Sequence, residues 1–256
     1  MNILIPAIVF AVAVLLFAVM PSRMKRERYE ALAGRFYANG GLYDNNGVPE
    51  NSLAAFRLAV EKGYGSKLDV QFTSDKRLIV FRDDDYGRMC GDHRRVRDVP
   101  FSEASRMLLL HSGEKIPQLG EVLHLVDGMQ PLIIEIRTCG STRKWIGEIC
   151  METLSQLREY GGAYCVGGTG PYVAGWFWRH AHDIVRGQLM RGIDDSGRRR
   201  NHCLLNFIGR PHFIAMDRTN RVFWQKLMRI LGAMTVLFSL ATLQESEELI
   251  DRKSVV

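Results

Sequence analysis

The chain has 256 residues, of which 46% are hydrophobic and 24% charged, and its formal net charge is +6. These values exclude an intrinsically disordered chain and allow either two small domains or one large α/β domain. The basic residues are scattered in short groups and the five cysteines contain no C-x-x-C pair, so the sequence argues against nucleic-acid binding, a CxxC metal or redox site and a disulfide framework.

The N-terminal segment is apolar. No charged residue occurs from Ile3 to Met20, a length just sufficient for a helix that crosses a hydrocarbon core. A cleaved signal peptide is the alternative, but no Lys or Arg precedes the apolar run and no A-x-A cleavage site precedes Ser22. We therefore expect a retained transmembrane anchor over residues 1–22.

A basic cluster follows the apolar run and consists of Arg23, Lys25, Arg26 and Arg28. Because only the terminal amine precedes the run, the positive-inside rule places the rest of the chain in the cytoplasm. The free-thiol pattern of the cysteines also favours a reducing compartment. We expect a single-pass protein of the cell membrane, with a juxtamembrane linker over residues 23–34 that can bind anionic membrane lipids.

Beyond residue 34 the sequence alternates between short β-rich runs and helical patterns, as in parallel βα units. The predicted strands are Arg35–Ala38, Lys67–Phe72, Leu78–Phe81, Pro131–Arg137, Ala163–Val166, Ile184–Gln188, Phe213–Met216 and Thr235–Leu240. The predicted helices are Ser52–Lys62, Phe101–Leu110, Gly120–Val126, Arg143–Tyr160, Tyr172–His180 and Arg221–Leu231. Seven or eight such units predict a (β/α)8 barrel over residues 35–256, with its site on the loops that follow the strands.

Three ordered segments carry a family resemblance: Tyr37–Leu42, Pro49–Phe56 and Gly63–Val70. Their order and spacing resemble the opening of the glycerophosphodiester phosphodiesterase family, and further matching segments run as far as Leu204–Phe207, as in its bacterial membrane-anchored branch. The resemblance implies a TIM barrel that hydrolyses glycerophosphodiesters to glycerol 3-phosphate and an alcohol in lipid metabolism. It also implies a divalent metal, calcium or magnesium, as cofactor.

The two histidine positions of that family are substituted. The first histidine belongs to an A-H-R-G motif that here reads A-N-G-G, so Asn39 replaces the histidine and Gly40 replaces the phosphate-facing arginine. The second belongs to an H-D pair, and here Arg82 precedes Asp83. Neither an amide nor a guanidinium exchanges a proton near neutral pH, so both catalytic positions lose acid–base function.

The metal ligands implied by the resemblance are Asp69, Glu135 and Glu50, with Arg137 as a further site residue for the substrate. Lys67 stands where the family's E-x-D pair has its glutamate, and strand geometry places it on the same face as Asp69. An ammonium about 4 Å from a divalent ion would be repelled by about 8 kcal/mol at an effective dielectric of 20. We expect weak metal binding or none, and ion pairs among the charged residues instead.

Three interpretations follow. The first is a membrane-anchored, catalytically impaired family member, a pseudoenzyme, that retains binding of a glycerophosphodiester, a phosphate-like anion or a lipid headgroup. The second is an active metal-dependent phosphoric diester hydrolase, which would need His93 or a partner side chain as acid–base group. The third is a product of a decayed gene without a stable fold, because the family's last strand would only begin where the sequence stops. His180 and His182 show no third ligand and are interpreted as surface residues.

Overall fold

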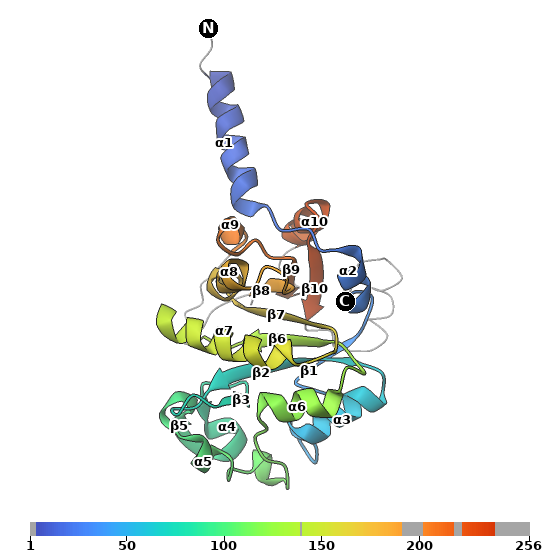
Figure 1. The fold of residues 1–256 in the computed structure, drawn as a ribbon, viewed down its shortest axis with the longest axis vertical. Coiled ribbons are helices and arrows are strands. Elements are labelled where there is room, and N and C mark those ends of the chain that lie inside the picture. Colours follow the sequence, from blue (N-terminus) through green and yellow to red (C-terminus); the bar gives the residue numbers. More distant parts are fainter. Residues whose placement is uncertain (1–3, 139, 191–201, 218–221, 239–256) are drawn as a thin grey trace. The chain divides into compact units, whose positions relative to one another are not determined.

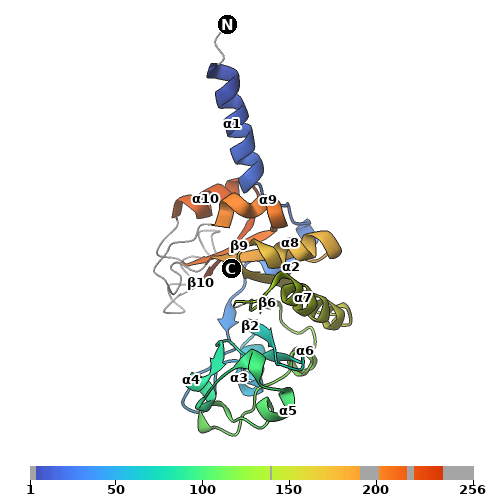
Figure 2. The same cartoon turned by 90° about the vertical axis from the view of Figure 1, so that its left-hand side faces the viewer.

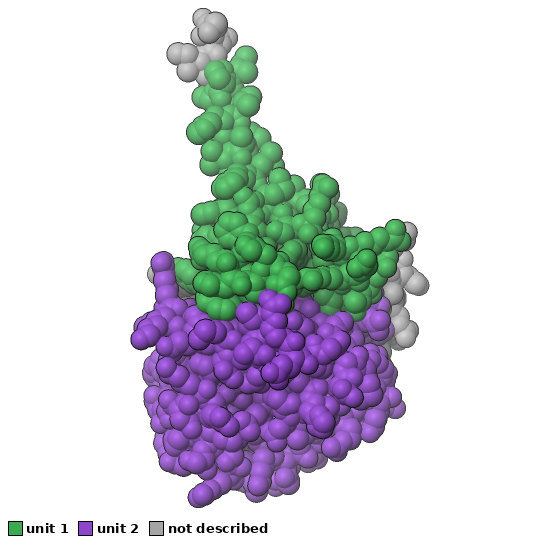
Figure 3. Space-filling model, in the orientation of Figure 1, with its two compact units in different colours: residues 1–33, 168–256 green, residues 34–167 purple. Residues whose placement is uncertain are grey.

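The computed structural model describes residues 4–138, 140–190, 202–217 and 222–238. The chain divides into two compact units, residues 34–167 and residues 1–33 with 168–256, which Figure 3 colours separately. The expectation about the last barrel strand concerns residues 239–256, which lie outside the described part of the chain.

The unit of residues 34–167 is built on parallel strands in chain order, β1 (Tyr37–Asn39), β2 (Gly65–Phe72) and β6 (Leu132–Ile136), and it ends within β7 (Tyr164–Thr169), which follows β6 in the sheet order. Its longer helices are α3 (Leu53–Glu61), α6 (Leu119–Val126) and α7 (Arg143–Arg158) (Figure 1). Every residue of β6 is buried, as expected for a strand covered on both faces of a parallel sheet. Any ionisable residue in β2 or β6 must therefore find partners inside the unit.

Shorter elements connect β2 to β6. They are β3 (Leu78–Val80), β4 (Asp85–Tyr86), α4 (Gly87–Cys90), β5 (Asp92–Arg95), α5 (Phe101–Ala104) and two 3-10 turns, Val96–Asp98 and Leu109–His111. The β3 strand pairs antiparallel with β2, so the prediction of a further parallel barrel strand at Leu78–Phe81 is wrong. The predicted helix Phe101–Leu110 is also too long, because α5 ends at Ala104 and the backbone of Leu110 has a positive φ of 48°.

Local sequence signals explain where the helices start. The Ser52 hydroxyl accepts a hydrogen bond from the Ala55 amide at 3.1 Å, and the Thr142 hydroxyl accepts one from the Trp145 amide at 3.3 Å. Both are N-caps that satisfy amides left without a partner at the first helical turn. Gly41 lets β1 approach α3, because a Cβ at this position would lie 2.6 Å from the carbonyl carbon of Ala55.

The second unit contains α1 (Leu4–Val19), α2 (Arg26–Leu32), α8 (Pro171–His180), β8 (Arg186–Met190), a 3-10 turn η3 (His202–Leu205), α9 (Asn206–Gly209), β9 (Phe213–Asp217), α10 (Val222–Ile230) and β10 (Met234–Phe238). Its strands are parallel in the order β8-β9-β10. Buried side chains from α1, β8, β9 and α10 form one apolar core, which includes Val19, Met190, Ile214 and Met228.

The expected transmembrane helix is not confirmed. The apolar N-terminal segment forms α1, a helix of 16 residues. Within the described ranges, none of the helices combines the length and the apolar character needed to cross a membrane.

Candidate functional site

The register of β2 and β6 brings three of the predicted site residues together. Asp69 pairs with Glu135 in the parallel ladder, and Lys67 lies two residues before Asp69 on the same strand. Residues two apart in a strand point to the same face, so Lys67 and Asp69 project to one side. The Asp69 and Glu135 side chains are almost fully buried, at 0% and 1% exposure, and that of Lys67 is 13% exposed.

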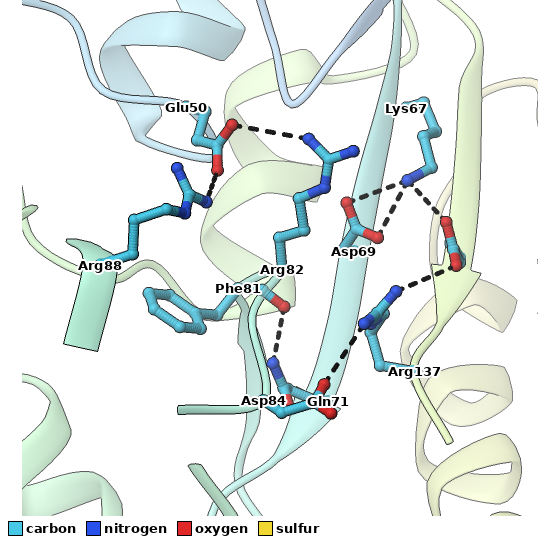
Figure 4. Close-up of polar contacts among 10 residues, drawn as sticks. Glu50, Lys67, Asp69, Gln71, Phe81, Arg82, Asp84, Arg88 and Arg137 are labelled. Atoms are coloured by element: carbon cyan, nitrogen blue, oxygen red, sulfur yellow. Dashed lines mark hydrogen bonds and ion pairs between the residues drawn. The ribbon is translucent and has the colours of Figure 1, made fainter. Parts of the chain in front are cut away.

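The Lys67 ammonium lies between the two buried carboxylates (Figure 4). Its Nζ atom is 2.9 Å from Asp69 Oδ1, 3.0 Å from Asp69 Oδ2 and 2.6 Å from Glu135 Oε2. The Arg137 guanidinium approaches from the other side, with Nη1 3.5 Å from Glu135 Oε1 and Nη2 3.3 Å from Asp84 Oδ1. Two buried anions are thus neutralised by two cations of the chain itself.

Burial raises the pKa of the Asp69 carboxyl above its usual range. The charge of Lys67 acts in the opposite direction, and the neighbouring Glu135 adds to the increase. The ammonium of Lys67 therefore favours the ionised carboxylate, which would otherwise be costly to bury.

A second cluster surrounds Glu50, which precedes α3 and is almost fully buried. Its carboxylate contacts Arg88 Nη2 and lies 3.6 Å from Arg82 Nη1. The Arg88 Nε atom also donates to Asp83 Oδ2 at 2.7 Å. Glu50 is thus engaged by two arginines, so its carboxylate faces positive charge already supplied by the chain (Figure 4).

Asn39 and Gly40 lie at the end of β1, beside these clusters. Asn39 is exposed and pairs with Lys67 in the β1–β2 ladder. The Gly40 amide donates to the Lys67 carbonyl at 2.7 Å, and the Gly40 carbonyl accepts from the Asn51 amide at 2.7 Å. Gly40 has a φ of 84°, and a Cβ there would lie 3.4 Å from Glu50 Cβ. Asn39 and Gly40 thus lie beside Lys67 and Glu50, as the resemblance implies. Position 40, however, holds a glycine in place of the expected arginine and so offers no guanidinium to a phosphate.

Sequence reasoning overlooked three residues of this site, namely Gln71, Asp84 and Arg88. The Gln71 amide donates to the carbonyls of Phe81 and Asp83 at 2.8 Å each, and so holds the backbone on both sides of Arg82. Its position two residues after Asp69 on the same strand face could have revealed it. No sequence pattern indicates the contacts of Asp84 and Arg88, because they depend on how the β3–β4 connection folds back.

Three histidines, considered above as an acid–base group or as metal ligands, are all exposed. His93 is exposed on β5, where its ring packs against Gly87 closely enough that a Cβ on that glycine would lie 2.8 Å from Nδ1. His180 is exposed at the end of α8 and stacks on Trp176 with ring centroids 4.6 Å apart. His182 is exposed as well. The surface interpretation of His180 and His182 agrees with this placement.

The three expected metal ligands do not fit a divalent cation in this arrangement. Asp69 and Glu135 share the Lys67 ammonium, and Glu50 is paired with Arg82 and Arg88. Within the part of the chain that the structure describes, no group of three or more His, Cys, Asp or Glu side chains could hold a metal ion. An ion placed among the carboxylates would meet the ammonium at close range and be repelled.

Comparison with known proteins finds a family likeness in one part of the chain. Residues 41–159 match the sequence model of the Glycerophosphoryl diester phosphodiesterase family. Over these residues the chain is similar to members of that family. The matched region contains Glu50, Lys67, Asp69, Arg82 and Glu135, so the clusters described above lie within the family's own segment.

Curated family members are similar over the same part of the chain. A glycerophosphodiester phosphodiesterase of Caldanaerobacter subterraneus is 36% identical over 103 residues, which are 37% of this chain and 42% of the relative. One from Bacillus altitudinis is 33% identical over 120 residues, which are 44% of this chain and 48% of the relative. The match thus spans less than half the length of these curated relatives.

Solved structures of the family show the same fold over most of the chain. A glycerophosphodiester phosphodiesterase from Parabacteroides distasonis superposes with a TM-score of 0.70 at 20% identity, covering 86% of this chain and 90% of that one. An Oleispira antarctica phosphodiesterase, solved in complex with the product sn-glycerol-3-phosphate, superposes with a TM-score of 0.73 at 17% identity, covering 90% and 94%. This likeness supports the predicted α/β barrel fold.

Proposed function

We propose that the chain is a glycerophosphodiester phosphodiesterase-family protein that binds a phosphate-like anion but has lost most or all metal-dependent hydrolysis. The observation that carries this proposal is the Lys67 ammonium, which lies 2.6–3.0 Å from both buried carboxylates. A divalent ion in the same place would have to displace a cation that is covalently part of the chain. This competition makes metal binding less favourable.

The proton-transfer positions support the same conclusion. Hydrolysis of a phosphodiester needs a proton for the leaving alkoxide, and groups with a pKa near neutrality supply it. Position 39 holds an amide and position 82 a guanidinium, and neither kind of group serves as a proton donor or acceptor near neutral pH. Loss of acid–base assistance typically lowers the rate by about 10²- to 10⁴-fold.

Anion binding is supported by the geometry of Arg82. Its side chain is 33% exposed, and its separation of 3.6 Å from Glu50 is too long for a hydrogen bond. A guanidinium offers five N–H donors in a planar fork that matches phosphate oxygens. The solved relative from Oleispira antarctica holds sn-glycerol-3-phosphate, which makes this the first compound to test.

The decisive assay is turnover of glycerophosphocholine by the full chain with calcium or magnesium and with a chelator. We expect no difference between these conditions for the wild-type chain. Metal-stimulated turnover that is abolished by Asp69→Ala would contradict the proposal and establish the active hydrolase instead. The variant carrying Asn39→His, Lys67→Glu and Arg82→His, run beside it, tests whether these three positions limit the rate.

Binding is measured separately, by calorimetric titration with sn-glycerol-3-phosphate. Arg82→Ala is expected to weaken binding, whereas the matched control Arg57→Ala, which removes an exposed arginine from α3, is expected to leave it unchanged. Equal affinities of wild type and Arg82→Ala would remove Arg82 from the proposed anion site.

We also propose that α1 associates with the cell membrane and that the remainder of the chain faces the cytoplasm. Apolar side chains of α1 are exposed along most of its length, among them Leu4, Ile8, Phe10 and Phe17. Burial of such a surface in lipid is favourable, and the free energy gained is proportional to the apolar area removed from water. Cell fractionation tests the association. Labelling of intact cells with a membrane-impermeant thiol reagent tests the orientation, since modification of Cys90 would contradict it.

A further inference from the structure

The outer face of α10 combines apolar and basic side chains. Phe223 and Ile230 are 68% and 82% exposed, and their spacing of seven residues places them on one face of the helix. Lys226 and Arg229 are exposed beside them. Met228 points the other way and is buried in the core of its unit, so α10 is already packed on one side while a second apolar face remains uncovered.

The buried side of α10 lies next to the end of α1. The Asn206 amide donates to the Val19 carbonyl at 2.7 Å and contacts Met228 Sδ at 3.4 Å, so that α9 links the end of α1 to α10. The Phe207 ring stacks on Phe17 with centroids 6.3 Å apart. Figures 1 and 2 both show α9 and α10 flanking the base of α1. Leu204 and Phe207 add exposed apolar surface there.

The charged side chains of η3, α9 and α10 are all basic. The segments η3, α9 and α10 contain no acidic residue, whereas α10 exposes Lys226 and Arg229 and the residue after α9 is Arg210. Arg210 lies with its guanidinium 4.4 Å from the centre of the Phe17 ring. An apolar face bordered by Lys and Arg is typical of helices that lie in a lipid interface.

We propose that the exposed faces of α9 and α10 form a contact surface for an anionic lipid bilayer. The proposal extends the proposed association of α1 with the membrane and rests on it, but it is independent of the catalytic proposal. Phe223 and Ile230 enter the headgroup–acyl boundary while Lys226 and Arg229 face lipid phosphates. The surface thereby gives this unit a second contact with the membrane besides α1 and so fixes its orientation.

The experiment compares binding of the full chain to vesicles of phosphatidylcholine and of an equimolar mixture with phosphatidylglycerol. Phe223→Ser with Ile230→Ser is expected to lower the partition coefficient at least about tenfold on both vesicle types. Lys226→Gln with Arg229→Gln is expected to lower it about 25-fold, about fivefold for each charge, on the mixed vesicles alone.

Matched controls come from the other unit. Met129→Ser with Met151→Ser removes two exposed apolar side chains, and Arg57→Gln with Lys62→Gln removes two exposed charges, one from α3 and one from the residue after it. Both controls are expected to bind like the wild type. Thermal unfolding by circular dichroism verifies that each variant is folded, which is expected because all the substituted side chains are exposed.

The outcomes separate the two proposals. Wild-type binding that none of the α10 substitutions weakens would overturn the lipid surface and leave the α1 association standing. No binding by the wild type would overturn both. A dimer that dissociates in the Phe223→Ser, Ile230→Ser variant, measured by light scattering in detergent, would assign the face to a second copy of the chain and overturn the lipid surface.

Discussion

Removal of the Lys67 ammonium is the sharpest test of how this site is held together. Lys67→Met keeps the length of the side chain but removes the cation that contacts both buried carboxylates, Asp69 and Glu135, whereas Arg137 Nη1 stays 3.5 Å from Glu135 Oε1. Deleting one partner of a buried ion pair typically costs about 3–5 kcal/mol, because the remaining charge is uncompensated. For a chain of this size, that corresponds to a fall in Tm of roughly 6–20 °C.

The second variant, Lys67→Glu, reverses the charge and adds a third carboxylate to Asp69 and Glu135. Without metal we expect it to be at least as unstable as Lys67→Met, because like charges are then buried together. With a divalent cation we expect recovery by mass action, about 2.7 kcal/mol when the ion is present at 100 times its Kd. The wild type should gain nothing, since its ammonium already lies between the carboxylates.

The assay is thermal unfolding of the wild type, both variants and the control Lys62→Met, each with chelator and with calcium or magnesium. Lys62 is an exposed lysine that follows α3, so its loss should change Tm little. Two results would refute the reasoning. One is a wild type stabilised by the metal as strongly as Lys67→Glu, and the other is a Lys67→Met variant as stable as the wild type.

Three further predictions concern stability. Burial, with the nearby charge of Arg186, lowers the pKa of His212 from 6.5 to about 4. Between these two pH values His212 is protonated in the unfolded chain but neutral in the folded one. The free energy of unfolding should therefore fall by roughly 3 kcal/mol as the pH drops from about 6.5 to 4. Denaturant titrations across this range should show a smaller loss for His212→Gln and an unchanged loss for the exposed His180→Gln. Gly41→Ala should lower the free energy of unfolding by at least about 2 kcal/mol, because φ is +80° and the new Cβ would clash with the α3 backbone. Gly47→Ala is the control: a Cβ there meets no atom within 4 Å, so the same denaturant titration should show no change. Gln71→Leu should cost about 1–3 kcal/mol in chemical denaturation, because two carbonyls lose their donor; an unchanged midpoint would show that water replaces the amide.

Periodicity in the sequence predicted the regular elements well. The strands predicted at Lys67–Phe72 and Pro131–Arg137 agree with β2 and β6 to within two residues at each end, because both are β-rich runs bounded by turn residues. The helix predicted at Phe101–Leu110 failed for a physical reason. Its apolar residues pack into the core around Phe81 and Tyr86 from a short helix and a 3-10 turn, so tertiary contacts override local helix preference.

The site was predictable only in part. Strand alternation places Lys67 with Asp69, and the family motif adds Glu135 and Glu50 to the same region. What no pattern specifies is which charge pairs with which, because that depends on the β2–β6 register and on the path of the chain between β3 and α4. A contact between Arg88 and Glu50, 38 residues apart, illustrates this.

The arrangement of charges explains how such a site can persist without metal. A buried pair of carboxylates requires a counter-charge, which a metal ion supplies in metal-dependent enzymes and Lys67 supplies here from the neighbouring position on β2. This counter-charge is present whenever the chain is folded, so stability no longer depends on the concentration of a divalent ion. Under the proposed function, the same lysine would exclude the Lewis acid that stabilises the charge developing on a phosphodiester. Stability of the fold and metal-dependent catalysis would then make opposite demands on residue 67, and a lysine would satisfy only the first.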